Sequence, residues 1–164
     1  MPDKTPLLLT TADHALLNTR IVDYFCSRAR AANCDVVVGV ALRETVTAAY
    51  PETRRTAVHL QDGAYCGCNL FAFLTPQARL AADFWRNVEA RRKKPLRMIA
   101  VLGWTTVLRY LLGHLSLAEA LSRISQRMGI KAGAVVMPFP EAAIDVDSPG
   151  DWQLVEKIVS DRQR

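Results

Sequence analysis

The segment DVVVGVAL, residues 35–42, decides the fold class of this chain. Its apolar and β-branched residues run without polar alternation, as in a strand buried on both faces of a parallel sheet. The segment TPLLLTTA, residues 5–12, has the same character. Between them, residues 16–33 carry apolar side chains at helical spacing, with Asn18 or Thr19 as the expected cap. Strand, helix and strand in this order predict a βαβ unit.

The alternation continues outward from this unit. Two strands are expected around the turn dipeptide Asp62-Gly63, three helices from about residues 75, 96 and 116, a strand at 131–140 and a last helix at 149–164. The pair Ser116 and Glu119 fits a capping box, and Gly129 a helix end. The sequence therefore predicts one α/β domain over residues 1–164, a three-layer sandwich with a mixed, mostly parallel sheet. Residues 84–130 are expected to form a helical insertion within it.

The charge of the chain is only moderately basic. It has 21 Lys and Arg against 16 Asp and Glu, a net charge of +5, and part of the excess lies in RRKKPLR at residues 91–97. This run suits a solvated helix end, or contact with phosphates or a membrane surface. No aromatic interleaving or known module indicates nucleic-acid binding.

The cysteines and the N-terminus indicate a cytoplasmic protein. Cys66 and Cys68 stand too close together for the usual zinc knuckle, so four buried, reduced thiols are expected. The opening MPDKTP lacks the apolar core of a signal peptide, and the uncharged run 98–108 is too short to span a bilayer.

Three places combine polar residues with predicted strand ends, where ligands bind in open α/β sheets. Asp13 follows the first strand, and either caps the next helix or binds a metal ion. Gly67 and Asn69 lie in GAYCGCNLF, as a bulge and a strand-end amide or as a binding turn. In AAIDVDSPGDW, Asp147 leads into a helix start, but Asp145 has no capping role.

Two separated carboxylate positions at strand ends can converge on one hard cation. Mg²⁺ is often held by one or two carboxylates, while phosphate oxygens and waters fill its other positions. Metal ions that bridge phosphates catalyse phosphoryl and nucleotidyl transfer.

The segments LLLTTADHALL, GCNLFAF and AIDVDSPGDWQLVEKI resemble the MobA-like NTP transferases, nucleotidyltransferases related to molybdenum-cofactor guanylyltransferase. The resemblance implies the GT-A fold of nucleotide-diphospho-sugar transferases. That family begins with a glycine-rich loop, L-A-G-G-x-G-x-R, that cradles the triphosphate. The chain shows no such loop, so the resemblance covers the later part of the family's fold, and an N-terminally truncated version is expected.

The resemblance implies a reaction and roles for particular residues. A phosphate-bearing or similar small acceptor would attack the α-phosphorus of an NTP and release pyrophosphate. Asp13 would be the catalytic metal ligand, with Asp145 or Asp147, and the ion would be Mg²⁺. Substrate contacts would come from a further set of residues: Gly67, Asn69, His14 and Arg43, with Arg54 and Arg55 as other phosphate candidates.

Two alternatives stay open at this point. The missing loop favours a non-catalytic, truncated interaction domain, whose open sheet edge would make it a homo-oligomer. A GT-A glycosyltransferase using a nucleotide-sugar is the other, although Asp13 stands alone where an acidic pair is usual.

Overall fold

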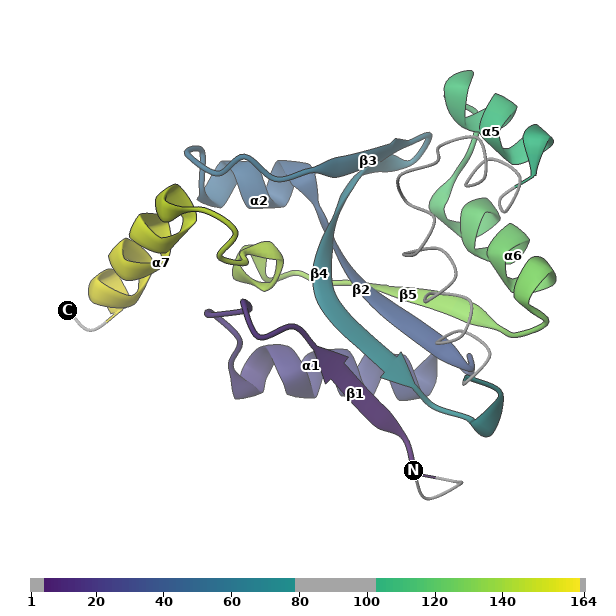
Figure 1. The fold of residues 1–164 in the computed structure, drawn as a ribbon, viewed down its shortest axis with the longest axis horizontal. Coiled ribbons are helices and arrows are strands. Elements are labelled where there is room, and N and C mark those ends of the chain that lie inside the picture. Colours follow the sequence, from purple (N-terminus) through teal and green to yellow (C-terminus); the bar gives the residue numbers. More distant parts are fainter. Residues whose placement is uncertain (1–4, 79–102, 163–164) are drawn as a thin grey trace.

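A computed structural model describes residues 5–78 and 103–162 of the chain. Its centre is a five-stranded sheet in the order β1-β4-β2-β5, with β3 also paired to β4 (Figure 1). The strands have the following bounds: β1 Leu7–Thr10, β2 Val36–Leu42, β3 Ala57–Leu60, β4 Gly63–Phe73 and β5 Ala132–Val136. The predicted α/β class and the mixed sheet are confirmed.

The strand β4 separates strands that run parallel to one another. It pairs antiparallel with β1, β2 and β3, whereas β2 and β5 pair parallel. Four of the five strands therefore share one direction, but three of the four described ladders are antiparallel. The prediction of a mostly parallel sheet holds for strand direction and is wrong for pairing, because the hairpin strand inserts between the two strands of the βαβ unit.

The helices largely follow the sequence pattern. Their bounds are α1 Thr19–Ala31, α2 Arg43–Ala49, α5 Trp104–Leu111, α6 Leu117–Met128 and α7 Pro149–Arg162, with short 3₁₀ turns η1 at Pro76–Ala78 and η2 at Pro140–Ala143. Asn18 caps α1 as predicted, accepting from the Ile21 amide at 3.1 Å. The short helix α2 was not predicted. The helices expected within 79–102 lie outside the described residues.

The main core lies between the sheet and α1. Ile21 and Phe25 of α1 are fully buried, and Figure 1 shows the helix lying along one face of the sheet. A Cβ on Gly39 would lie 3.1 Å from the Leu70 Cβ and 3.5 Å from Phe25, so glycine lets the helix and β4 approach β2 closely. This packing fixes the position of α1 on the sheet.

A smaller cluster covers the other face. Val36 packs there with Ala78 and Ile130, and Met128 at the end of α6 lies against them. Since Val36 and the buried Val37 alternate along β2, the two clusters lie on opposite faces. Helices therefore flank the sheet on both sides, as a three-layer arrangement requires.

The β3–β4 hairpin turns one residue earlier than predicted. Leu60 pairs with Gly63, so Gln61 and Asp62 form the turn and Gly63 begins β4. The Asp62 carboxylate accepts from the amide of Leu117, at 3.0 and 3.2 Å, which ties the hairpin to the start of α6.

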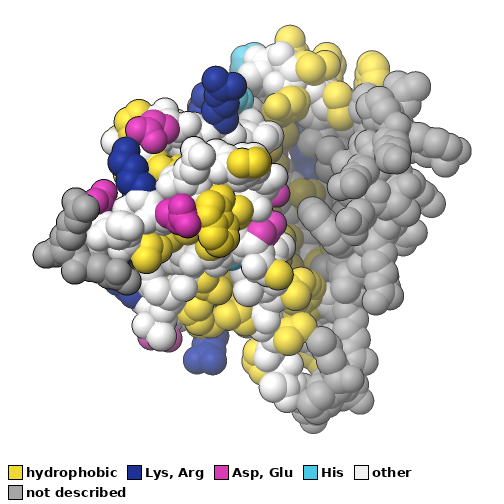
Figure 2. All heavy atoms as spheres, turned by 60° about the vertical axis from the view of Figure 1, so that its left-hand side comes forward, with side chains coloured by type: hydrophobic (Ala, Val, Ile, Leu, Met, Phe, Trp, Pro, Cys, Tyr) yellow, Lys and Arg dark blue, Asp and Glu magenta, His cyan; other side chains and the backbone are white. Residues whose placement is uncertain are grey.

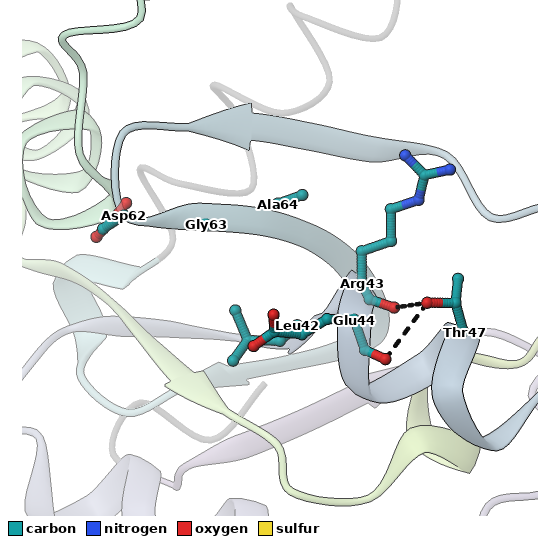
Figure 3. A pocket seen from close by; sticks show the side chains of 7 residues that line it. All are labelled: Leu42, Arg43, Glu44, Thr47, Asp62, Gly63 and Ala64. Atoms are coloured by element: carbon teal, nitrogen blue, oxygen red, sulfur yellow. Dashed lines mark hydrogen bonds between the residues drawn. The ribbon is translucent and has the colours of Figure 1, made fainter.

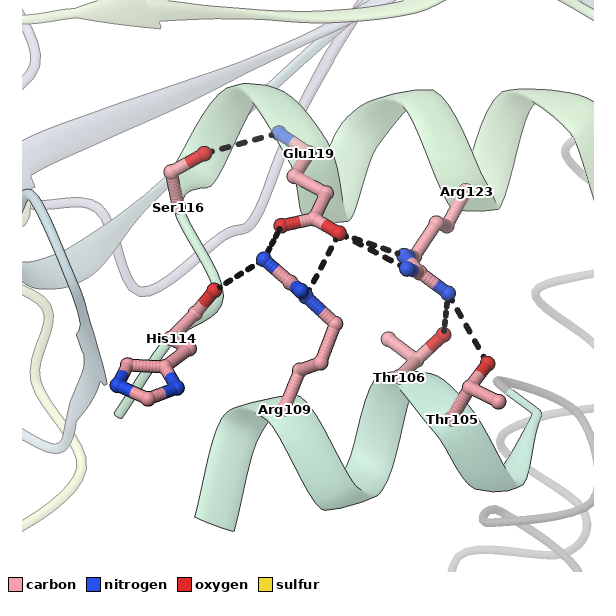
Figure 4. Close-up of polar contacts among 7 residues, drawn as sticks. All are labelled: Thr105, Thr106, Arg109, His114, Ser116, Glu119 and Arg123. Atoms are coloured by element: carbon pink, nitrogen blue, oxygen red, sulfur yellow. Dashed lines mark hydrogen bonds and ion pairs between the residues drawn. The ribbon is translucent and has the colours of Figure 1, made fainter. Parts of the chain in front are cut away.

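Helices α5 and α6 are joined by one carboxylate. Glu119 binds the guanidinium groups of Arg109 and Arg123, and Arg123 also donates to the hydroxyls of Thr105 and Thr106 (Figure 4). Hydrogen bonds from Arg123 and Arg109 hold the pKa of Glu119 below its ordinary value. The predicted cap is confirmed, because Ser116 Oγ accepts from the Glu119 amide, but the Glu119 side chain turns to the arginines instead of completing a capping box.

The four cysteines are free, as expected, but only Cys66 and Cys68 are buried; Cys26 and Cys34 are half-buried. Burial raises the pKa of Cys68 to about 12, so this thiol is protonated and unreactive. On the face in Figure 2, acidic, basic and apolar side chains are interspersed. Among the described helices none has the length and apolarity to cross a membrane.

Candidate functional site

The site begins at an irregularity in β4. Val38 pairs with Phe71 and Val40 pairs with Gly67, so residues 68–70 bulge opposite the single residue Gly39. Asn69, in the bulge, has a φ of +50°, a left-handed conformation that Asn adopts more readily than most residues. The bulge re-aims the Asn69 side chain away from the regular alternation of the strand.

The same stretch of β4 lies at a gap on its other edge. Along this edge of β4, β3 pairs with residues up to Cys66, and the pairing with β1 starts at Leu70. Within the described strands, residues 67–69 therefore have no ladder partner on this edge. The loop that follows β1 and the segment after η2 contribute the side chains at this position.

The two acidic segments predicted from the sequence meet here. The amide of Val146 donates to the carbonyl of Asp13 at 3.1 Å, although the two residues are far apart in the chain. The Asp13 carboxylate accepts a short hydrogen bond from the Thr11 hydroxyl. Asn18 takes the cap of α1, so the interpretation of Asp13 as the helix cap is wrong.

Asp145 has a protein partner on each carboxylate oxygen. Arg55 forms an ion pair with Oδ1, and the Asn69 amide donates to Oδ2 at 2.7 Å. Arg55 also donates from Nε to the Ala143 carbonyl at 2.6 Å. Sequence reasoning placed Arg55 only among three arginines that could contact phosphate, and no local pattern links it to an aspartate ninety positions away.

His14 follows Asp13 directly in the chain and is only 6% exposed. Its Nδ1 shares a hydrogen bond of 3.2 Å with the Thr10 hydroxyl, while Nε2 is buried with no hydrogen-bond partner among the described residues. Burial lowers the pKa of His14; the Asp13 carboxylate opposes that shift and Arg55 adds to it. The imidazole is therefore neutral near pH 7.

The remaining predicted residues are distributed around this centre. Asp147 is exposed, immediately before the start of α7. Ser148 caps that helix as predicted, since its Oγ accepts from the Asp151 amide at 3.3 Å. Gly67 is exposed beside the bulge, and a Cβ at this position would have no heavy atom within 4 Å.

Arg43 lies apart, in a separate surface pocket. The pocket, of about 420 Å³, is formed by the start of α2 and the β3–β4 hairpin, with Arg43, Glu44 and Asp62 around it (Figure 3). Arg43 is 3.4 Å from His59 Nε2. Ala64 in this pocket and Asn69 are five strand positions apart, or roughly 15 Å. Among the described residues Arg43 contacts His59, and it forms no hydrogen bond or ion pair with Asp13 or Asp145.

Carboxylate oxygens are the donors that a hard cation such as Mg²⁺ prefers, and two of the three aspartates could offer one. Asp13 has one oxygen engaged by Thr11, and Asp147 is exposed, so both can offer a carboxylate oxygen to Mg²⁺. Asp145 is already neutralised by Arg55. Over residues 5–78 and 103–162 there is no group of three or more His, Cys, Asp or Glu side chains placed to hold a metal ion.

Comparison with known proteins gives one informative likeness. No family model matches the chain, and no curated protein matches it. Among solved structures, a hypothetical transferase from Thermus thermophilus is similar to it, with a TM-score of 0.82 and 34% identity. The likeness covers 90% of this chain and 63% of that chain, so this chain spans less than two thirds of the Thermus protein. The two proteins share their fold over the covered residues.

Proposed function

We propose that this chain is a transferase of the nucleotidyltransferase kind. The observation that carries the proposal is the hydrogen bond between Val146 and Asp13, which joins two acidic segments at the carboxyl end of β1. Ligands of open α/β sheets bind at such strand ends. The likeness to a hypothetical transferase supports the broader activity, and the resemblance to MobA-like NTP transferases supports nucleotidyl transfer.

In the proposed reaction, a phosphate oxygen of a small acceptor attacks the α-phosphorus of an NTP. The bond from that phosphorus to the oxygen bridging to the β-phosphate breaks, and pyrophosphate leaves with the electron pair. Mg²⁺ would neutralise the charge that develops on the phosphate oxygens. Asp13 would hold the ion, with Asp147 or Asp145 as the second carboxylate.

Other residues shape the site around the reacting groups. Neutral His14, next to Asp13 in the chain, would support the loop through its hydrogen bond with Thr10. Asn69, oriented by the bulge, would contact the acceptor. The open surroundings of Gly67 would leave room for the acceptor beside the backbone. Arg43 would contact a phosphate only of an acceptor long enough to reach its separate pocket.

Pyrophosphate release tests this function. The chain is incubated with each of the four NTPs, Mg²⁺ and a panel of small phosphorylated acceptors, and pyrophosphate formation is followed. Calorimetry with Mg²⁺ and the nucleotides then compares the wild type with Asp13→Ala and with Asp23→Ala, an exposed carboxylate on α1. We expect Asp13→Ala to abolish Mg²⁺-dependent nucleotide binding and Asp23→Ala to preserve it. Unchanged binding by Asp13→Ala would refute its role as metal ligand.

A second candidate function is that of an interaction domain with the same fold. The outer edge of β1 favours it, since within the described residues β1 pairs only with β4 and exposes Leu9. Strand edges of this kind recruit other chains. Pyrophosphate release by the purified chain would decide for the enzyme.

A further inference from the structure

The Asp145 carboxylate is charge-paired within the chain, although its buried Oδ1 accepts no hydrogen bond from the described residues. Arg55 pairs with one oxygen and Asn69 donates to the other. The exposed fractions of the two charged side chains are 11% for Arg55 and 17% for Asp145. Little water reaches the pair, so its attraction is weakly screened and both charges depend on each other for compensation.

Arg55 is also anchored independently of Asp145. Its Nε donates to the Ala143 carbonyl at 2.6 Å, two positions before Asp145. One guanidinium therefore holds both the backbone and the side chain of the segment that follows η2. Because the guanidinium is planar and binds in two directions, it is fixed at one position beside the carboxylate. A flexible arginine on the surface would not be held in this way.

A divalent cation bound to Asp145 would lie next to the Arg55 guanidinium. Like charges at contact distance repel strongly where water is largely excluded. Asp13 does not have this conflict, because its partner is the neutral hydroxyl of Thr11. Asp147 does not have it either, being exposed to solvent. The three aspartates are therefore unequal as ligands.

We propose that Arg55 is the resident cation of Asp145 and competes with a divalent ion for that carboxylate. Asp145 becomes a metal ligand only when the Arg55–Asp145 pair opens, and Arg55 thereby controls the affinity of the site for the ion. This inference rests on the proposed function, since it concerns the ion that the function requires. A guanidinium released in this way is a bidentate donor for phosphate oxygens, so ion binding would free a phosphate-binding group.

Calorimetric titration with Mn²⁺ tests the competition directly. Four proteins are compared with the wild type at fixed ionic strength: Arg55→Gln, Asp145→Asn, the double variant of both, and Arg30→Gln. Arg55→Gln removes the competing charge and is expected to tighten Mn²⁺ binding by about tenfold. Arg30 is an exposed arginine on α1, so Arg30→Gln loses the same charge elsewhere and is expected to leave the affinity unchanged. The double variant is expected to lose the gain.

Folding is checked by circular dichroism and thermal unfolding in EDTA. A folded Arg55→Gln protein whose Mn²⁺ affinity is equal to, weaker than or as undetectable as that of the wild type would overturn the proposal. Should Arg55→Gln not fold, Arg55→Lys is titrated instead. Its single ammonium cannot hold both Ala143 and Asp145 in the same way, and a smaller gain is expected; no gain would overturn the proposal.

These outcomes are distinct from those of the proposed function. A gain in Mn²⁺ affinity without any pyrophosphate release would refute nucleotidyl transfer and leave the role of Arg55 intact. Pyrophosphate release by the wild type, with no gain in Mn²⁺ affinity in Arg55→Gln, would support nucleotidyl transfer and refute the competition between Arg55 and the ion.

Discussion

At the scale of single residues, His14 is a titratable group that the fold buries beside the candidate site. It is 6% exposed, and its pKa lies below the ordinary value because burial disfavours the charged imidazole. A buried, neutral histidine next to a predicted ligand makes the site sensitive to protonation.

This burial predicts a pH dependence of stability. A lowered pKa means that the folded protein binds the His14 proton less tightly than the unfolded chain does. The contribution of the neutral His14 imidazole to the free energy of unfolding is therefore fully present above the ordinary pKa of about 6.5. It is lost as the pH falls below that value towards the folded-state pKa. We expect the free energy of unfolding, measured with urea, to decrease between pH 7 and pH 5.

The His14→Gln variant should flatten that decrease, because its side chain does not titrate. His59, which is exposed, provides the control, and His59→Gln should retain the slope of the wild type. Carboxylates with lowered pKa values, such as Asp35 and Glu119, lose their contributions at lower pH, outside this window. Equal slopes in the wild type and His14→Gln would contradict the prediction.

At the scale of elements, features set by residues close together in the chain could be predicted from the sequence, and features set by distant segments could not. The starts of α1, α6 and α7 follow from Asn18, Ser116 and Ser148, whose side chains bind amides three residues ahead. The bulge at Asn69 and the Arg55–Asp145 pair depend on segments distant in sequence. Local hydrogen bonding is readable from sequence, whereas register and long-range ion pairs require the assembled sheet.

Helix α6 ends as its sequence predicts, and this end can be tested. Gly129 has a φ of +65°, and a Cβ there would have no heavy atom within 4 Å. Gly129→Ala should therefore cost about 1 kcal/mol of unfolding free energy through backbone strain alone. Gly67 has equally open surroundings without a positive φ, so Gly67→Ala should be nearly neutral by urea denaturation. Equal costs at the two glycines would show that the backbone conformation at Gly129 is not the cause.

At the scale of the whole molecule, the two ends of the sheet are protected differently. At one end, β5 pairs with β2 and has no strand on its outer edge within the described residues, but it packs against both α1 and α6. At the other end, β1 pairs with β4 and has Leu9, 49% exposed, on its surface. Within the described residues no strand covers the outer edge of β1, and the candidate site lies at the carboxyl end of that strand.

The edge of β1 therefore predicts self-association of the purified chain. Unpaired amide and carbonyl groups beside an exposed leucine favour the addition of a strand from a second copy. We expect sedimentation equilibrium to show a concentration-dependent oligomer that Leu9→Lys weakens, because a lysine on the edge opposes strand pairing. Val136, 42% exposed on β5, supplies the matched control, and Val136→Lys should leave the association unchanged. A monomer at all concentrations, or equal effects of the two lysines, would exclude β1 as the associating edge, and the site at its end would then stay open to solvent in every copy.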